Sequence, residues 1–338
     1  MLKTQRFGLL PQTPLNGIRQ EARLNNKVHT RYVQIVAQEQ VDITVAGTGL
    51  RNRGSVWASF DEIGINDNGD DRDLVDGPTL RYLTEMHSPS AVATRRLGNP
   101  GVQATTIIRE VARIWFSHPL AGNPSETTFK ERDEKHQVTV FYKWNNSIAK
   151  LVDGGVTGTV TAPVITAYQE ADRLSQVKPI FVPTMRQIVA TVPSASTQQE
   201  ILIKAQNPLR ALVIKQETDS GEVGDIITSL RFLSDNRHII GPNFISWRDL
   251  TLASQYEFGG DVANPEGSAG LGVNAYLGFN FQEGGRLSNV LDSPREPNLR
   301  LEVNAAPSAF GANSKIRVTL LELEREPGIT ADEAPFTI

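Results

Sequence analysis

Two stretches of this chain, about 165 positions apart, follow the same order of residue types. The first runs from Asp67 to Tyr82 and the second from Asp235 to Trp247. Each begins with Asp-Asn, passes two adjacent apolar residues and a Gly-Pro pair, and ends near an aromatic residue. This spacing is too long for a solenoid or propeller, whose repeats are roughly 20–50 residues, so it predicts a duplicated domain. The alternative is that two unrelated hairpins use the same turn residues.

Apolar and polar residues alternate with a period of two in several segments, as expected of strands with one buried face. Val138–Trp144 and Leu299–Val303 follow this pattern. Ile316–Leu320 follows it too, but the phase reverses at Leu321, which predicts a β-bulge. Many such short runs, separated by turn residues, predict an all-β protein.

Two stretches also fit a helix. In residues 107–115 the apolar residues fall on one helical face, and Thr166–Leu174 contains good helix formers behind a possible capping box. Few, short helices are therefore expected.

The composition excludes several classes of protein. The chain has 338 residues, which suits two domains, and it has no cysteine. It contains no run of 18 apolar residues that would span a bilayer. The five histidines are scattered singly, and neither a phosphate-binding loop nor a catalytic triad motif is recognisable. We therefore expect no enzymatic activity and no cofactor.

Two further groups of residues have both a structural and a functional interpretation. The acidic cluster Asp67, Asp70, Asp71, Asp73 and Asp76 has enough oxygen ligands for calcium, but it lacks the EF-hand order and is typical of a solvated turn. The four tryptophans would suit a sugar-binding groove, but their apolar, strand-like surroundings favour core packing. The tryptophans are Trp57, Trp115, Trp144 and Trp247.

The N-terminal segment is basic although the chain has a formal net charge of −4. Six basic residues face one acidic residue, Glu21, within positions 1–31. Such a segment is suited to contact with phosphate, of lipid or of nucleic acid; a solvated terminus is the alternative. The basic residues are Lys3, Arg6, Arg19, Arg23, Lys27 and Arg31.

The turn and proline pattern suggests the division of the chain. The proline-containing segment before the second set of strands is interpreted as a connector. The expected parts are a basic arm at 1–30, a first jelly roll at 31–175, a connector at 176–194, a second jelly roll at 195–327 and a tail at 328–338.

The duplicated strand pattern resembles the double jelly-roll major capsid proteins of tailless, often membrane-containing icosahedral bacteriophages. The similarity is one of pattern over about residues 30–327, since no short motif is diagnostic. In the first half, Val56–Phe60, the Asp67-Asn68 turn and Thr79–Leu83 look like the C strand, a turn and the D strand. In the second half the similar runs are Leu209–Ile214, Thr228–Asn236, Gly285–Asp292 and Asn298–Val303.

This resemblance implies two tandem jelly-roll barrels in each subunit. Three subunits would form a pseudo-hexagonal capsomer that tiles an icosahedral shell, so the implied location is the virion. The implied partners are further copies of the chain, neighbouring capsomers, and vertex (penton) and minor capsid proteins. The basic arm would face inward and contact an internal membrane or the genome. The N-terminus lacks a secretory apolar run, so synthesis in the host cytoplasm is expected.

Two other classes of protein remain open from the sequence. One is a carbohydrate-binding or carbohydrate-active protein built of two β-sandwiches, which as an enzyme would need two carboxylates about 5–10 Å apart in an aromatic-lined groove. The other is a cell-surface or fibre-forming structural protein, which the N-terminal sequence disfavours.

Overall fold

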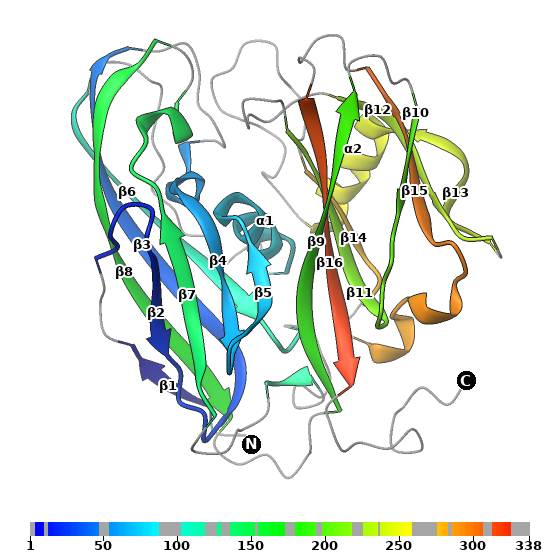
Figure 1. Cartoon of the computed structure of the whole chain (residues 1–338), viewed down its shortest axis with the longest axis horizontal. Helices are drawn as coiled ribbons and strands as arrows, with labels where there is room; N and C mark the ends of the chain where they lie inside the picture. The colour runs from blue at the N-terminus through cyan, green and yellow to red at the C-terminus, as the bar shows by residue number, and fades with distance from the viewer. Residues whose placement is uncertain are drawn as a thin grey trace. The chain divides into compact units, whose positions relative to one another are not determined.

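The chain forms two compact units in a computed structural model (Figure 1). Unit 1 comprises the described residues up to 184, and unit 2 comprises those from 185 to 324. The structure describes residues 4–9, 13–46, 54–87, 103–118, 127–129, 136–152, 155–172, 180–193, 198–217, 226–235, 237–258, 276–282, 286–306 and 313–325.

Unit 1 contains two four-stranded sheets, ordered β1-β8-β3-β6 and β2-β7-β4-β5. All the neighbouring strands pair antiparallel. The elements are β1 (Thr4–Gly8), β2 (Arg19–Arg23), β3 (His29–Val45), β4 (Phe60–Asp67), β5 (Asp70–Val75), α1 (Gly77–His87), β6 (Gln103–Trp115), β7 (Val138–Trp144) and β8 (Thr157–Asp172), with short 3-10 helices η2 (Val56–Ser59) and η5 (Ile148–Lys150).

Unit 2 also has two sets of four strands, ordered β14-β11-β16-β9 and β10-β15-β12-β13. Its elements are β9 (Phe181–Pro193), β10 (Gln198–Leu202), β11 (Leu209–Glu217), β12 (Ile227–Leu233), β13 (His238–Ser246), α2 (Trp247–Phe258), β14 (Tyr276–Asn280), β15 (Arg300–Ala305) and β16 (Asn313–Arg325), with 3-10 helices η7 (Leu287–Asn289) and η8 (Ser293–Arg295).

The two units have the same topology. Numbered from the first strand of each unit, the orders are 1-8-3-6 and 2-7-4-5 in both. Two four-stranded antiparallel sheets connected in this order form a jelly roll. The α-helix of each unit follows the fifth strand, as α1 after β5 and α2 after β13. The predicted all-β fold with two tandem jelly rolls and few helices is therefore confirmed.

The Asp-Asn repeat marks an equivalent place in each unit. Asp67 and Asn68 connect β4 to β5, where Asn68 has a positive φ of 56°, a conformation that asparagine tolerates. Asp235 lies between β12 and β13, and Asn236 lies outside the described residues. Both turns thus join the fourth strand to the fifth, which is what a duplicated domain predicts.

The prediction that Thr79–Leu83 forms a D strand is wrong: these residues lie in α1. Asp76 caps this helix, since its Oδ1 accepts a hydrogen bond from the backbone N–H of Thr79 at 2.9 Å. Pro78 occupies the first turn, where a missing N–H costs nothing. In unit 2 the Gly-Pro pair lies inside β13, so the two copies diverge after the turn.

The two stretches with helical character are also strands. Residues 107–115 belong to β6, which pairs with β3 in a long antiparallel register. Ile108, Glu110, Ala112 and Ile114 are buried, whereas the alternate residues Arg109, Val111 and Arg113 are not, so the true period is two. The buried Glu110 interrupts the apolar pattern and hides that period. Residues 166–172 belong to β8, and 173–174 lie outside the described residues.

The core prediction for the tryptophans is confirmed for three of the four. Trp57, Trp144 and Trp247 are at most 2% exposed, whereas Trp115 is partly buried on the outer face of β6. The predicted bulge is also present. The pairing of β11 with β16 skips Arg210, opposite the place where the phase of β16 reverses.

The segments expected as an arm and a connector contain strands. Within residues 1–30, β1 pairs with β8 and β2 pairs with β7, so each adds an edge strand to a sheet of unit 1. Within 176–194, β9 pairs with β16 and has prolines near both of its ends, where strands tolerate them. These segments are therefore bonded into the sheets of the fold.

Candidate functional site

The six basic residues predicted to contact phosphate do not lie on one element. Lys3 is outside the described residues, and Lys27 lies in the turn before β3. The structure places the others on three strands: Arg6 on β1, Arg19 and Arg23 on β2, and Arg31 on β3. The strands β1 and β2 belong to different sheets of unit 1, so these side chains are distributed over two sheets.

Two of these arginines are engaged by carboxylates of unit 1. Arg19 makes a bidentate contact with Asp71, with both N–O distances 2.7 Å, and its guanidinium lies 3.6 Å from the centre of the Phe141 ring. The hydrogen bond from Arg19 holds the pKa of Asp71 below its usual range. Arg6 pairs with Glu170 at 3.1 Å. The Arg6 pair links β1 to β8, and the Arg19 pair links β2 to β5.

The acidic cluster is also engaged by protein groups. Asp67 accepts a hydrogen bond from Arg72 at 2.7 Å and contacts His136. Asp71 binds Arg19, and Asp76 caps α1. Among the residues that the structure describes, no three His, Asp or Glu side chains are placed to hold a metal ion.

A second acidic group lies inside unit 1. Glu39 and Glu110 are 1% and 0% exposed. Glu39 accepts a hydrogen bond from Trp144 Nε1 at 2.8 Å, and its other oxygen lies 3.3 Å from Ser59 Oγ. Burial raises the pKa of Glu39 to about 8, because a charged carboxylate is poorly solvated there.

Glu110 contacts residues at the start of η2 and within α1. It accepts hydrogen bonds from the backbone N–H of Val56 at 2.7 Å and from the Ser55 hydroxyl, and Arg81 Nε lies 3.7 Å from its other oxygen. Arg81 also pairs with Glu85 at 2.9 Å. This acid pair is enclosed in the barrel, so it does not form the open, aromatic-lined carboxylate site that a glycosidase needs.

The outer face of the sheet β1-β8-β3-β6 carries a group of aromatic and arginine side chains that the sequence analysis missed. Tyr32 on β3 and Trp115 on β6 lie opposite each other, with ring centres 4.6 Å apart. The Arg113 guanidinium lies 5.0 Å from the Tyr32 ring centre and 5.2 Å from that of Trp115. Gln34 accepts a hydrogen bond from Arg113 at 3.0 Å. This geometry is a cation–π arrangement that fixes the arginine on the sheet.

Apolar side chains continue this outer face along the strands. Val36 lies opposite Val111, and both are partly exposed. Ile107 on β6 is 40% exposed and Val164 on β8 is 49% exposed. We call the outer surface of β8, β3 and β6 the aromatic–arginine face. The helix predicted for 107–115 would not form this face, because the face exists only when the residues alternate between two sides of a strand.

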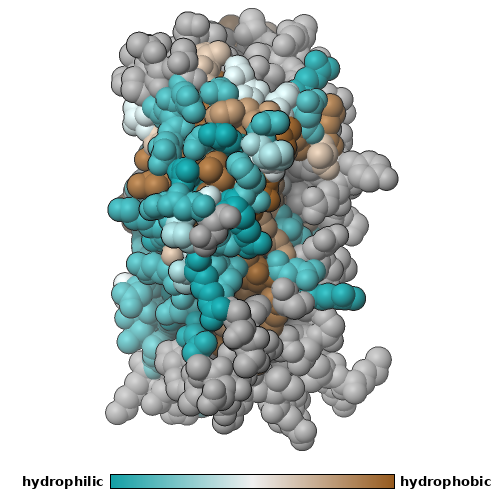
Figure 2. Space-filling view, turned by 90° about the vertical axis from the view of Figure 1, so that its right-hand side faces the viewer, coloured by the Kyte–Doolittle hydropathy of each residue, from teal (hydrophilic) through white to brown (hydrophobic). Residues whose placement is uncertain are grey.

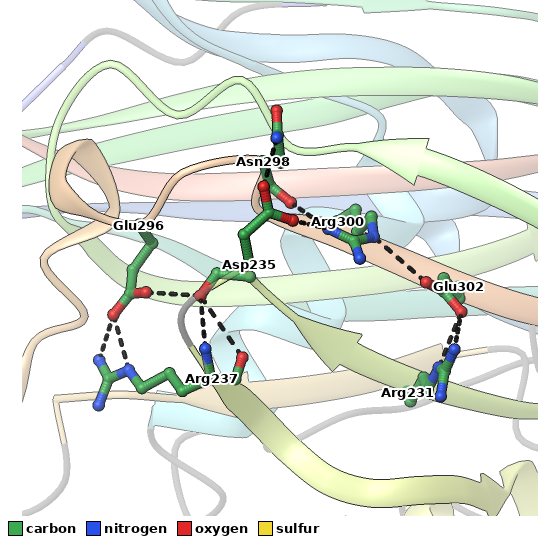
Figure 3. A network of polar contacts seen from close by, with 8 residues as sticks. Arg231, Asp235, Arg237, Glu296, Asn298, Arg300 and Glu302 are labelled. Atoms are coloured by element: carbon green, nitrogen blue, oxygen red, sulfur yellow. Dashed lines mark hydrogen bonds and ion pairs between the residues drawn. The ribbon is translucent and has the colours of Figure 1, made fainter.

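Unit 2 has a different polar surface on β12, β15 and the turns beside them (Figure 3). Glu302 on β15 binds Arg231 at 2.6 Å and Arg300 at 3.2 Å. Arg300 reaches Asp235 at 2.8 Å, and Asn298 Nδ2 donates to the same carboxylate at 2.5 Å. Burial opposes ionisation of Glu302, but the two arginines hold its pKa below the usual range.

A neighbouring part of this network binds the following turn. Glu296 accepts hydrogen bonds from Ser234 at 2.6 Å and from Arg237 at 2.7 Å (Figure 3). Viewed from this side, unit 2 presents a band of hydrophilic side chains with hydrophobic ones beside it (Figure 2). Within the network, each arginine is paired with an acid, so the surface is largely neutralised.

Comparison with known proteins identifies the fold. No protein-family model and no curated protein matches the sequence. The structure is similar to that of the major capsid protein P2 of bacteriophage PM2, with a TM-score of 0.60 and 11% identity over 97% of this chain and 100% of that one. It is also similar to the major capsid protein of Sulfolobus turreted icosahedral virus, with a TM-score of 0.67 and 10% identity over 95% of this chain and 97% of that one. A capsid model of PBCV-1 matches with a TM-score of 0.61 and 11% identity, over 96% and 94%. The chain has the double jelly-roll fold of these viral capsid proteins.

The similarity to double jelly-roll proteins covers both units rather than one. The matched share of each chain exceeds nine tenths, so both barrels belong to the shared fold. None of the similar structures named here is a carbohydrate protein, and the described carboxylate pair in unit 1 is buried. The described part of the chain also has no helix long and apolar enough to cross a bilayer.

Proposed function

We propose that this protein is the major capsid protein of an icosahedral virus. Three copies form a capsomer with six barrels around its axis, and capsomers tile the shell of the virion. The observation that carries this proposal is the pair of barrels with identical topology, which matches viral capsid proteins over nearly the whole length of both chains. Its mechanism is assembly, with order supplied by symmetry and no chemical reaction.

Duplication supports this function on physical grounds. A subunit with two similar barrels gives a threefold assembly an outline close to a hexagon, and hexagons tile a flat facet. The partners of the chain in this proposal are other copies of itself, neighbouring capsomers, and vertex (penton) and minor capsid proteins. The chain is synthesised in the host cytoplasm and ends in the virion.

The N-terminal segment has an additional role in this proposal, as the part that contacts an internal membrane or the genome. Deleting residues 1–30 is not a clean test, because it would also remove the strands β1 and β2. Replacing Lys3 and Lys27 with glutamine preserves both strands. We expect this variant to bind anionic vesicles or a single-stranded oligonucleotide more weakly than the parent chain. Equal binding would remove the role of these two lysines.

The assembly proposal is tested by the native mass of the purified chain. Multi-angle light scattering on a sizing column should give 3 × 37.1 kDa, about 111 kDa, at several protein and salt concentrations. A species of that mass supports a capsomer. A monomer of 37.1 kDa under every condition contradicts the proposal.

A further inference from the structure

The aromatic–arginine face of unit 1 has the composition of a protein interface. Tryptophan, tyrosine and arginine are the residues most enriched at binding hot spots. Here Trp115, Tyr32 and Arg113 are in mutual contact at one end of the paired strands β3 and β6. Their contacts hold the side chains in one arrangement, so little side-chain entropy is lost when a partner covers them.

The size and shape of the face indicate a macromolecular partner. Three strands about 4.8 Å apart, over the nine residues from Tyr32 to Gln40, give a footprint on the order of 400 Å². That is roughly half of the 800 Å² that each partner buries in a standard protein interface. The face is the outer side of a sheet, whereas small ligands bind in concave sites.

The charges on the face show what kind of contact it can make. Arg6, Arg109 and Arg113 point outward from β1 and β6, and Glu170 on β8 is the acidic residue among their cross-strand neighbours. Arg109 makes no ion pair with any residue that the structure describes. On the same side of the sheet, Ile107 is two residues from Arg109 on β6, and Val164 on β8 lies opposite Gln38, the β3 residue that pairs with Arg109. A basic face repels a second copy of itself, so a two-fold contact between identical faces is disfavoured.

The same chain supplies a complementary partner. Its formal net charge is −4, so the surface outside this basic face has an acidic excess. A contact between this face and a different, acidic face of a second copy is heterologous, and heterologous contacts close into rings such as trimers.

The corresponding face in unit 2 provides an internal comparison. The strand equivalent to β3 is β11, and all nine of its residues are buried, including those on its outer side. The outer side of the third strand is therefore buried in unit 2 and partly exposed in unit 1. The open face is the one with the hot-spot composition.

We propose that the aromatic–arginine face of unit 1 is the docking surface for a second copy of this chain, which binds through a different, acidic face. This inference rests on the proposed capsomer function and adds the surface and the head-to-tail geometry. It predicts an association driven by Val164, Ile107 and Trp115 and steered by Arg109.

The test uses two substitutions at exposed positions of the face, Val164→Glu and Arg109→Glu. Each has a matched control on α2 of unit 2: Leu252→Glu, at a residue that is 53% exposed, and Arg248→Glu, at an exposed arginine without an ion pair among the described residues. Sedimentation velocity measures the mass of each variant over a concentration series, and circular dichroism checks its fold.

We expect both face variants to associate at least ~10-fold more weakly than the parent chain, while both controls behave as the parent does. A trimeric parent with fully trimeric face variants would overturn the inference and leave the capsomer function intact. A monomeric parent would overturn both. If the face variants remain trimeric but lose binding to a glycan panel or an oligonucleotide, the face serves a different ligand and the inference is wrong. Should Val164→Glu fail to fold, Arg109→Glu decides, since that side chain makes no ion pair with the described residues.

Discussion

The third strands of the two barrels, β3 and β11, occupy the same place in the topology but differ in burial. β3 buries alternate residues and leaves the other side partly exposed, whereas β11 is buried at all nine positions. The sequences show why: β3 alternates apolar and polar residues, and β11 contains the nearly continuous run Ala211–Ile214. The two barrels thus share one scaffold, while the outer side of the third strand is partly exposed in unit 1 and buried in unit 2.

The interiors differ in a second way. Unit 1 encloses the acids Glu39 and Glu110, whereas the polar side chains buried in unit 2 include Arg210 and Gln216 on β11, beside a cluster of aliphatic and aromatic residues. The buried acids connect the barrel to η2 and α1 through Val56 and Arg81. Buried polar groups are costly unless their hydrogen bonds are satisfied, so the contacts of these acids are needed to stabilise unit 1.

The largest expected effect comes from Glu110→Ala. The substitution leaves the Val56 N–H without its acceptor and removes an acidic neighbour of Arg81 inside the barrel. Loss of one partner from a buried ionic group costs about 3–5 kcal/mol. Hydrogen exchange by mass spectrometry should show faster exchange in unit 1 peptides with unit 2 unchanged. Equal protection in the variant and the parent would show that Glu110 does not hold η2.

A pair of substitutions on the outer sides of equivalent strands tests the difference in burial directly. Val213→Ala on β11 truncates a fully buried side chain on the opposite side of the strand from the core residues Leu212 and Ile214, and should cost about 2 kcal/mol of unfolding free energy. Val36→Ala on the outer side of β3 should cost less than about 1 kcal/mol, because its site is partly exposed. Denaturant unfolding of each variant measures both values. Similar costs would contradict the difference between the strands.

The pKa of Glu39 predicts a pH dependence confined to unit 1. Because the folded pKa is about 8 and the ordinary value is 4.5, the folded state binds a proton that the unfolded state releases between those pH values. This contribution to stability is therefore full below pH 4.5 and decreases towards pH 8, by at most about 1.4 kcal/mol per pH unit. Glu39→Gln should flatten this slope in a pH series of unfolding curves. An unchanged slope would assign the dependence to another group.

The smallest effect is expected for Glu302→Gln in the surface network of unit 2. The variant weakens the contacts to Arg231 and Arg300, and surface pairs of this kind contribute about 0–1 kcal/mol. Because the pKa of Glu302 is lowered, the stabilisation in the parent is lost as the pH falls through the acidic range. Thermal unfolding at low and neutral pH should show a small difference at neutral pH only. A large loss would mean that this network, rather than the apolar core, holds unit 2.

Much of the fold could be predicted from the sequence because the relevant signals are local. The alternation in Val138–Trp144 predicts β7, the Asp-Asn pairs mark equivalent turns, and the phase reversal at Leu321 marks the bulge. These signals depend on strand periodicity and turn chemistry, which neighbouring residues determine.

The failures have a common physical cause, which is that tertiary burial overrides local pattern. Glu110 lies at an inward position of β6, so the segment did not look like a strand. Thr79–Leu83 is buried on all sides within α1 and therefore lacks the amphipathic pattern of a surface helix. The aromatic–arginine face could not be predicted, because Tyr32 and Trp115 are 83 positions apart in sequence and meet only through the pairing of β3 with β6.

In the proposed capsomer, each of three chains supplies two equivalent barrels. Cryo-electron microscopy of the purified oligomer can show this arrangement. We expect end-on averages with six similar lobes around a threefold axis. Particles with only two lobes at every concentration, or a closed ring with another symmetry, would contradict it.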